Sequence, residues 1–79
     1  MENPLQERYG QLLLEHIRAD SYPSVTHMDM LEAIATPRVL AEYTMHLMER
    51  IEADEYPSVP MMRRVQDLIS RWGLEQAPG

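Results

Sequence analysis

Apolar residues recur along the chain at steps of three and four, the spacing that places side chains on one face of an α-helix. Two long series, over roughly residues 4–20 and 38–54, predict the long helices. Their members are Leu5, Tyr9, Leu12, Leu13 and Ile17 in the first, and Leu40, Tyr43, Leu47 and Ile51 in the second. Two shorter series, from Val25 to Ile34 and from Val59 to Trp72, predict a second helix after each long one.

The two halves of the chain share a motif at a fixed offset. Residues 17–25 have the sequence IRADSYPSV and residues 51–59 have IEADEYPSV, so the offset is 34 residues. The same offset pairs further identical residues without a gap: Tyr9 with Tyr43, Leu13 with Leu47, Glu15 with Glu49, and Met28 with Met62. Self-similarity at a fixed period is typical of tandem structural units, here two helix–turn–helix hairpins.

The Tyr-Pro-Ser motif explains why each long helix ends. Proline pushes the preceding residue out of the helical region and lacks the N–H that would continue the helix. Ser24 and Ser58 then lie where a side-chain oxygen can accept an orphan N–H, so we expect them to be N-caps. Met28 and Met62 take the inner position of a hydrophobic staple with the preceding proline, which predicts that both belong to the core.

Other breaks frame the second helices. Thr36, followed by proline, is a candidate cap for the third helix. Pro60 falls within the first turn of the fourth helix, where a missing N–H does no harm. Gly73 is a natural stop for that helix.

These elements predict an all-α fold of four helices, arranged as two tandem hairpins that pack with pseudo-twofold symmetry. The chain of 79 residues is expected to form one helical domain. Copy one covers about residues 3–35, copy two about 37–73, and residues 74–79 form a frayed tail.

Charge and composition narrow the function. The net charge of −6 opposes binding to nucleic acid or to anionic membranes, which require a positive field. The chain lacks an apolar run long enough to span a bilayer, and its first residues lack a secretion signal, so we expect a cytoplasmic protein. It contains no cysteine and therefore no disulfide bond. A small core without disulfide bonds favours association into a homodimer.

The shared turn motif is also the first candidate site. Asp20, Tyr22, Asp54 and Tyr56 would face a protein partner at two equivalent positions. Turn and cap chemistry accounts for most of the motif and is the favoured interpretation. The two aspartates are the least explained, because a helix C-terminus favours cations over anions.

Methionine is frequent for a chain of this length, and its flexible side chain suits adaptable binding surfaces as well as irregular cores. With Met28 and Met62 assigned to the core, Met30, Met45 and Met61 are candidates for exposed or interface positions.

Catalysis and cofactor binding find little support. The three histidines, His16, His27 and His46, never share a helical turn, so we expect surface or half-buried side chains rather than metal ligands. The two capping serines are already engaged, and no glycine-rich phosphate loop occurs. We expect a non-enzymatic protein without cofactor or metal.

The fourth predicted helix carries the remaining alternative. Arg63, Arg64 and Arg71 could contact DNA from a recognition helix, which the acidic total charge opposes. The leading hypothesis is therefore a small interaction or regulatory protein that presents an acidic helical surface with Met and Tyr contacts. The alternative is a transcription-related DNA-binding protein.

Overall fold

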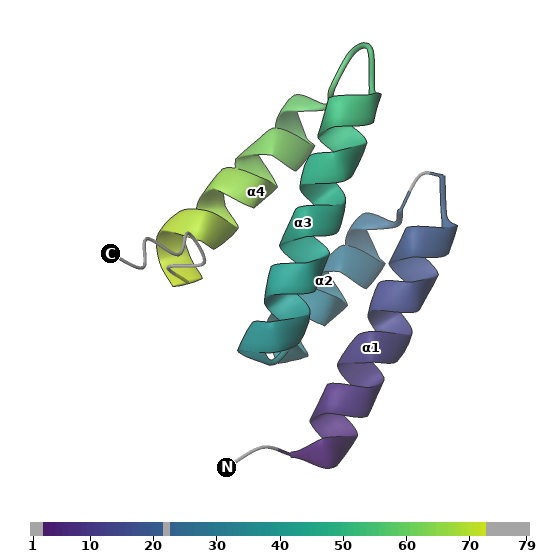
Figure 1. The fold of residues 1–79 in the computed structure, drawn as a ribbon, viewed down its shortest axis with the longest axis vertical. Coiled ribbons are helices and arrows are strands. Elements are labelled where there is room, and N and C mark those ends of the chain that lie inside the picture. Colours follow the sequence, from purple (N-terminus) through teal and green to yellow (C-terminus); the bar gives the residue numbers. More distant parts are fainter. Residues whose placement is uncertain (1–2, 22, 73–79) are drawn as a thin grey trace. The chain divides into compact units, whose positions relative to one another are not determined.

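The computed structural model describes residues 3–21 and 23–72, and within these ranges it contains four helices and no strand. The helices are α1 (Pro4–Ala19), α2 (Val25–Ile34), α3 (Pro37–Ala53) and α4 (Val59–Trp72) (Figure 1). The all-α prediction and the four expected helices are confirmed, with boundaries within one or two residues of those expected.

Side-chain caps explain where the helices begin. The Oγ of Ser24 accepts from the backbone N–H of His27, and the Oγ of Ser58 accepts from that of Met61, each at 3.3 Å. Thr36 Oγ1 accepts from the N–H of Val39 at 3.3 Å in the same way. The three predicted caps are thus confirmed, while Gly73 lies outside the described residues.

The beginning of α1 uses a signal that the apolar pattern does not contain. Asn3 is the N-cap, and its side chain accepts from Leu5 N at 3.0 Å and from Gln6 N at 3.4 Å. Pro4 occupies the first helical position, where its fixed φ suits the helix and its missing N–H leaves no bond unmade.

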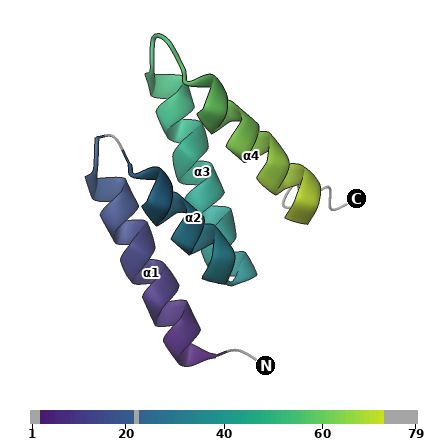
Figure 2. The same cartoon turned by 180° about the vertical axis from the view of Figure 1, so that it is seen from behind.

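The chain divides into two compact units, Met1–Tyr43 and Thr44–Gly79. The boundary falls within α3, so the first unit holds α1, α2 and the beginning of α3. The second unit holds the rest of α3 and α4. In the first unit α1 packs against α2, and in the second α3 packs against α4 (Figure 2). The pseudo-twofold relation of the two hairpins stays a prediction.

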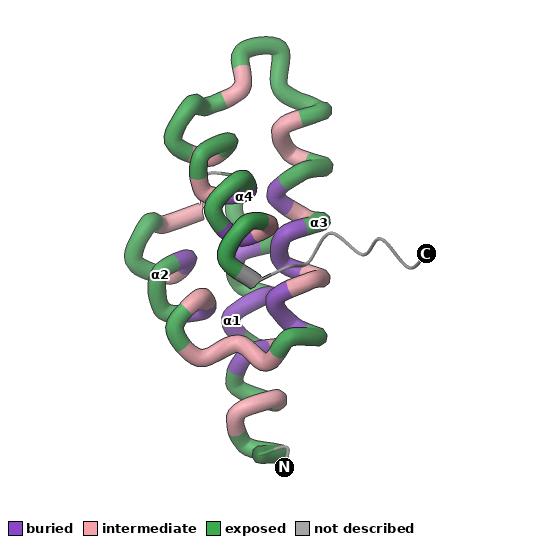
Figure 3. Tube along the Cα trace, turned by 90° about the vertical axis from the view of Figure 1, so that its left-hand side faces the viewer, coloured by how far each residue is buried: buried purple, intermediate pink, exposed green. Residues whose placement is uncertain are grey.

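The core of the first unit forms where the beginning of α3 lies against the α1/α2 pair. A Cβ placed on Gly10 would lie 3.4 Å from Val39, so these two helices approach closely. The Tyr43 hydroxyl donates to Glu32 on α2. The buried apolar residues are Leu13, Leu14, Ile17, Met28, Leu31, Val39, Leu40 and Tyr43 (Figure 3).

The buried face of α1 differs from the predicted one. Leu13 and Ile17 are buried as expected, whereas Leu5, Tyr9 and Leu12 are exposed. All five residues fit a helical spacing. The side of α1 that packs against neighbouring helices, however, runs through Gly10, Leu13 and Ile17, with Leu14 beside this line. The remaining three lie on the adjacent, solvent-facing side.

The assignment of Met62 to the core is wrong. In the second unit the buried residues are Thr44, Leu47, Val65 and Leu68, while Met62 is exposed and Met61 is half-buried. The inner line of α4 runs through Met61, Val65 and Leu68 at steps of four and three, so Met62 lies beside this line. Its equivalent Met28 is buried as expected.

Candidate interaction surface

The turn after α1 places one candidate acid at a helix end. Asp20 is the C-cap of α1 in an extended conformation, with its N–H donating to the carbonyl oxygen of Ile17 at 3.3 Å. Its side chain is exposed. Tyr22, the other candidate of this turn, lies outside the described residues. The backbone of Asp20 thus ends the helix, and its side chain lies at the surface of the turn.

The turn after α3 presents an acidic and aromatic surface. Asp54 donates its backbone N–H to Arg50 O at 3.1 Å, and the side chains of Asp54 and Glu55 are exposed. Tyr56 follows with 87% of its surface exposed. Two carboxylates and a phenol ring are thereby exposed to solvent on one short turn.

The three candidate methionines differ in exposure. Met30 on α2 is exposed, beside the exposed acid Asp29. Met61 is half-buried on the inner line of α4, so its surface is only partly available. Met45, the third predicted interface methionine, is exposed on α3.

The arginines of α4 do not form a uniform basic face. Arg63 is exposed, Arg64 is half-buried, and Arg71 is bound to Asp67 one turn earlier, with 2.9 Å between Nη2 and Oδ2. An exposed i,i+4 pair of this kind contributes little to stability. Asp67 nevertheless neutralises the positive charge of Arg71, which would otherwise attract a phosphate group.

The structure brings the predicted site residues together only in part. Asp20 and Met30 belong to the first unit, whereas Asp54, Tyr56, Met61, Arg63 and Arg64 belong to the second. Within the second unit, the acids and Tyr56 share the turn that leads directly into the α4 residues. This turn is the most compact group among the predicted positions.

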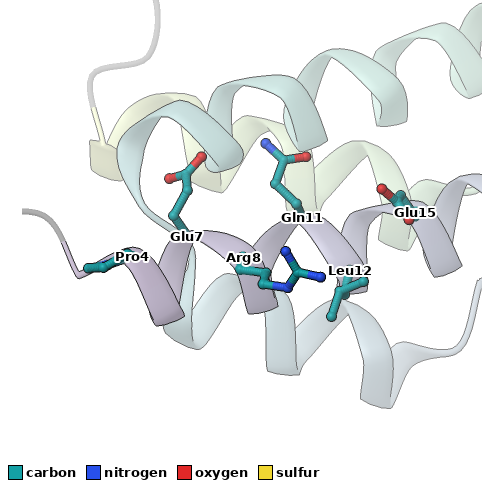
Figure 4. Close-up of a pocket in the computed structure, with 6 residues that line it drawn as sticks. All are labelled: Pro4, Glu7, Arg8, Gln11, Leu12 and Glu15. Carbon is teal, nitrogen blue, oxygen red and sulfur yellow. The ribbon is translucent and has the colours of Figure 1, made fainter.

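A shallow hollow on α1 was not anticipated from the sequence. It is lined by Pro4, Glu7, Arg8, Gln11, Leu12 and Glu15, all from this helix (Figure 4). Glu7 accepts from the Thr36 hydroxyl at 2.7 Å, and Gln11 Nε2 lies 3.5 Å from Glu42 Oε2, so this row of side chains is already bonded. Arg8 and Leu12 in the adjacent row are exposed. A hollow on one helix offers a contact surface and not the enclosed pocket that small ligands occupy.

The structure also brings together two histidines that the sequence analysis kept apart. The rings of His16 and His27 lie 6.2 Å apart between centroids, tilted by 39°. They stand six residues before and five after position 22, so folding the chain at this turn places them opposite one another. The pair could have been found in the sequence by comparing residues at similar distances before and after the turn. Among the described residues no group of three metal-ligating side chains occurs.

No family model, curated protein or solved structure matches this chain. In the part of the chain that the structure describes, no helix is both long and apolar enough to cross a membrane. A function must therefore be argued from the surface of the molecule itself.

Proposed function

We propose that this chain is a small non-enzymatic protein that acts by binding another protein. Its contact surface is acidic and helical, with Tyr and Met side chains supplying the apolar contacts. Self-association and a cytoplasmic location, without cofactor or metal, belong to the same proposal.

The exposed turn after α3 carries the proposal. Tyr56 is 87% exposed although it is a large ring, and it stands between acids and the beginning of α4. Tyrosine is enriched at interface hot spots because its ring buries much apolar area while its hydroxyl forms a hydrogen bond. A partner that covers this ring would bury its apolar area and could form a hydrogen bond with its hydroxyl.

The charge of the chain sets the kind of partner. With a net charge of −6, the protein attracts basic surfaces over long range and repels acidic ones. The exposed acids Asp54 and Glu55 directly precede Tyr56 in the chain, so a partner with lysine or arginine around an apolar patch would be complementary.

Affinity capture tests the proposal with three baits. The wild-type chain is expected to recover a specific protein from the source cell, and Tyr56→Ala should lose it. Glu52→Ala, a change at an exposed residue on the last turn of α3, is the matched control and should retain the partner. Capture of nothing by the wild type, or equal capture by all three, would contradict the proposal.

Charge reversal extends this test to both turns. Asp20→Arg and Asp54→Arg should each weaken capture while the circular dichroism spectrum is unchanged, because both carboxylates are exposed. Unaltered capture by the double variant would remove the acidic turns from the interface.

DNA binding through α4 is the second candidate, supported by the exposed side chain of Arg63. This candidate requires that the protein shift the mobility of random-sequence duplex DNA at low salt, about 50 mM, where phosphate contacts are strongest. Arg63→Glu combined with Arg64→Glu should abolish the shift. Absence of a shift with the wild-type protein would eliminate this candidate.

A further inference from the structure

At four positions of the 34-residue sequence repeat, equivalent apolar residues differ in exposure. At two positions of the long helices, the first-copy residue is exposed and its second-copy equivalent is buried: Leu5 is 77% exposed against 0% for Val39, and Tyr9 is 42% against 0% for Tyr43. At other positions the order is reversed: Met48 is 45% exposed against 1% for Leu14, and Met62 is 39% against 5% for Met28.

The buried members of these pairs all belong to the first unit. The beginning of α3 packs on the α1/α2 pair, with Val39 against Gly10 and the Tyr43 hydroxyl bonded to Glu32. Thr36 adds a hydrogen bond to Glu7 at 2.7 Å. Val39 and Tyr43 lie on the docking helix, and Leu14 and Met28 belong to the pair that receives it.

The exposed members lie on two separate faces, one in each unit. The head face consists of Leu5 and Tyr9 on α1, which are equivalent in sequence to the docking residues Val39 and Tyr43, together with the exposed Leu12. The tail face consists of Met48, Met62 and Gln66 on the α3/α4 pair, which are equivalent to the receiving positions Leu14, Met28 and Glu32. Each face is therefore one half of a contact whose other half stands elsewhere in the same chain.

We propose that a second copy of this chain docks head to tail, with the head face of one molecule on the tail face of the next. The contact between them uses sequence positions equivalent to part of the contact that α3 makes with the α1/α2 pair. This inference rests on the self-association in the proposed function and is independent of the partner at Tyr56.

The side chains of the two faces suit each other chemically. Tyr9 takes the place of Tyr43, and its hydroxyl would donate to the amide oxygen of Gln66, which stands where Glu32 accepts. Met48 and Met62 have flexible side chains that adapt to an apolar neighbour such as Leu5. The match is incomplete. Ala41 stands where Glu7 accepts from Thr36, and Thr44, which replaces Gly10, is buried within its own chain, so these two internal contacts have no counterpart. We therefore expect a weaker contact than the internal one.

The geometry has a consequence for assembly. Two different faces make the contact, so each dimer still exposes one head face and one tail face. Association then continues beyond two molecules unless the rotation between copies closes a ring. A dimer with a twofold axis would use one face on both molecules and would stop at two.

Two charged variants and their mixture test the inference. Leu5→Glu blocks the head face and Met48→Glu blocks the tail face, and both residues are exposed, so the helix content should be unchanged. Light scattering and sedimentation of the wild type should show a mass that rises with concentration. Each variant alone should remain monomeric, whereas an equimolar mixture should form a dimer that does not grow, because one intact head meets one intact tail.

Val25→Glu is the matched control. Val25 is 61% exposed and its equivalent Val59 is 54% exposed, so neither belongs to a face that differs between copies. This variant should associate like the wild type. A wild type that remains monomeric up to about 1 mM would overturn the inference. So would a mixture that stays monomeric, or a blocked variant that still associates. Partner capture through Tyr56 is unaffected by these variants, which separates the two proposals.

Discussion

At the scale of single residues, Thr36 connects two elements of the first unit. Its hydroxyl accepts from the N–H of Val39 at 3.3 Å and donates to Glu7 at 2.7 Å. The same side chain thus caps α3 and holds it against α1. A sequence signal shows only the first of these roles, because the second depends on a residue 29 positions away.

The Thr36→Ala variant should lose both bonds. We expect its free energy of unfolding to fall by about 1–2 kcal/mol, the usual cost of a lost cap and a lost hydrogen bond. Urea denaturation followed by circular dichroism measures this change. Thr26→Ala, on the exposed side of α2, serves as the control and should remain within about 0.5 kcal/mol of the wild type. Equal losses in both variants would argue against the double role of Thr36.

Gly10 provides a second prediction with the opposite sign. Glycine within a helix costs about 0.5–1 kcal/mol relative to alanine. A Cβ at this position would lie 3.4 Å from Val39, an ordinary van der Waals distance, so Gly10→Ala fits without overlap. We expect the thermal midpoint of unfolding to rise. A fall would mean that α1 and α3 approach more closely than these contacts indicate.

At the scale of helices, α2 depends on its neighbours. It is 10 residues long, shorter than an isolated helix needs to be stable in water. Its buried residues are Met28 and Leu31, so these two side chains connect it to the core of the first unit.

Leu31→Ala should therefore destabilise the first unit strongly. Leu31 is fully buried, and removing such a side chain costs about 2–5 kcal/mol. This loss is comparable with the total stability of a small domain, about 5 kcal/mol. Circular dichroism should show reduced helix content at room temperature. Met30→Ala, one residue earlier and exposed, should leave the helix content unchanged.

Helix faces show where sequence reasoning stops. The spacing in α1 admits both Leu13 and Leu12 to its apolar side, and the structure buries the first and exposes the second. In α4 the buried line passes through Val65 and Leu68 and leaves Met62 beside it. A helix of this composition has more apolar residues than its core needs, so the surplus is available for binding.

At the scale of the whole molecule, charge separates the two kinds of association. Two copies of a chain with a net charge of −6 repel each other, whereas a basic partner is attracted. Salt screens both effects over a distance of about 10 Å at 0.1 M. Salt should therefore act on the two complexes in opposite directions.

Raising the salt concentration from about 0.05 M to about 0.5 M should strengthen self-association and weaken the binding of the captured partner. Sedimentation measures the first change and calorimetric titration the second. The Val25→Glu variant, whose added charge lies outside both faces, should show the same salt dependence as the wild type. Self-association that weakens as salt is added would contradict an apolar contact between like-charged copies.

The sequence by itself determined the helices and their ends. Proline and the capping residues Ser24, Ser58 and Thr36 act on backbone groups within three residues, so local chemistry is sufficient to predict them. The tertiary structure alone decided which apolar residues are buried and which side chains meet. Tyr9 and Tyr43 are equivalent in sequence, yet only Tyr43 lies in the core, because its surroundings come from other helices of the fold. The division between core and surface, and with it the candidate binding faces, depends on contacts between residues far apart in the chain.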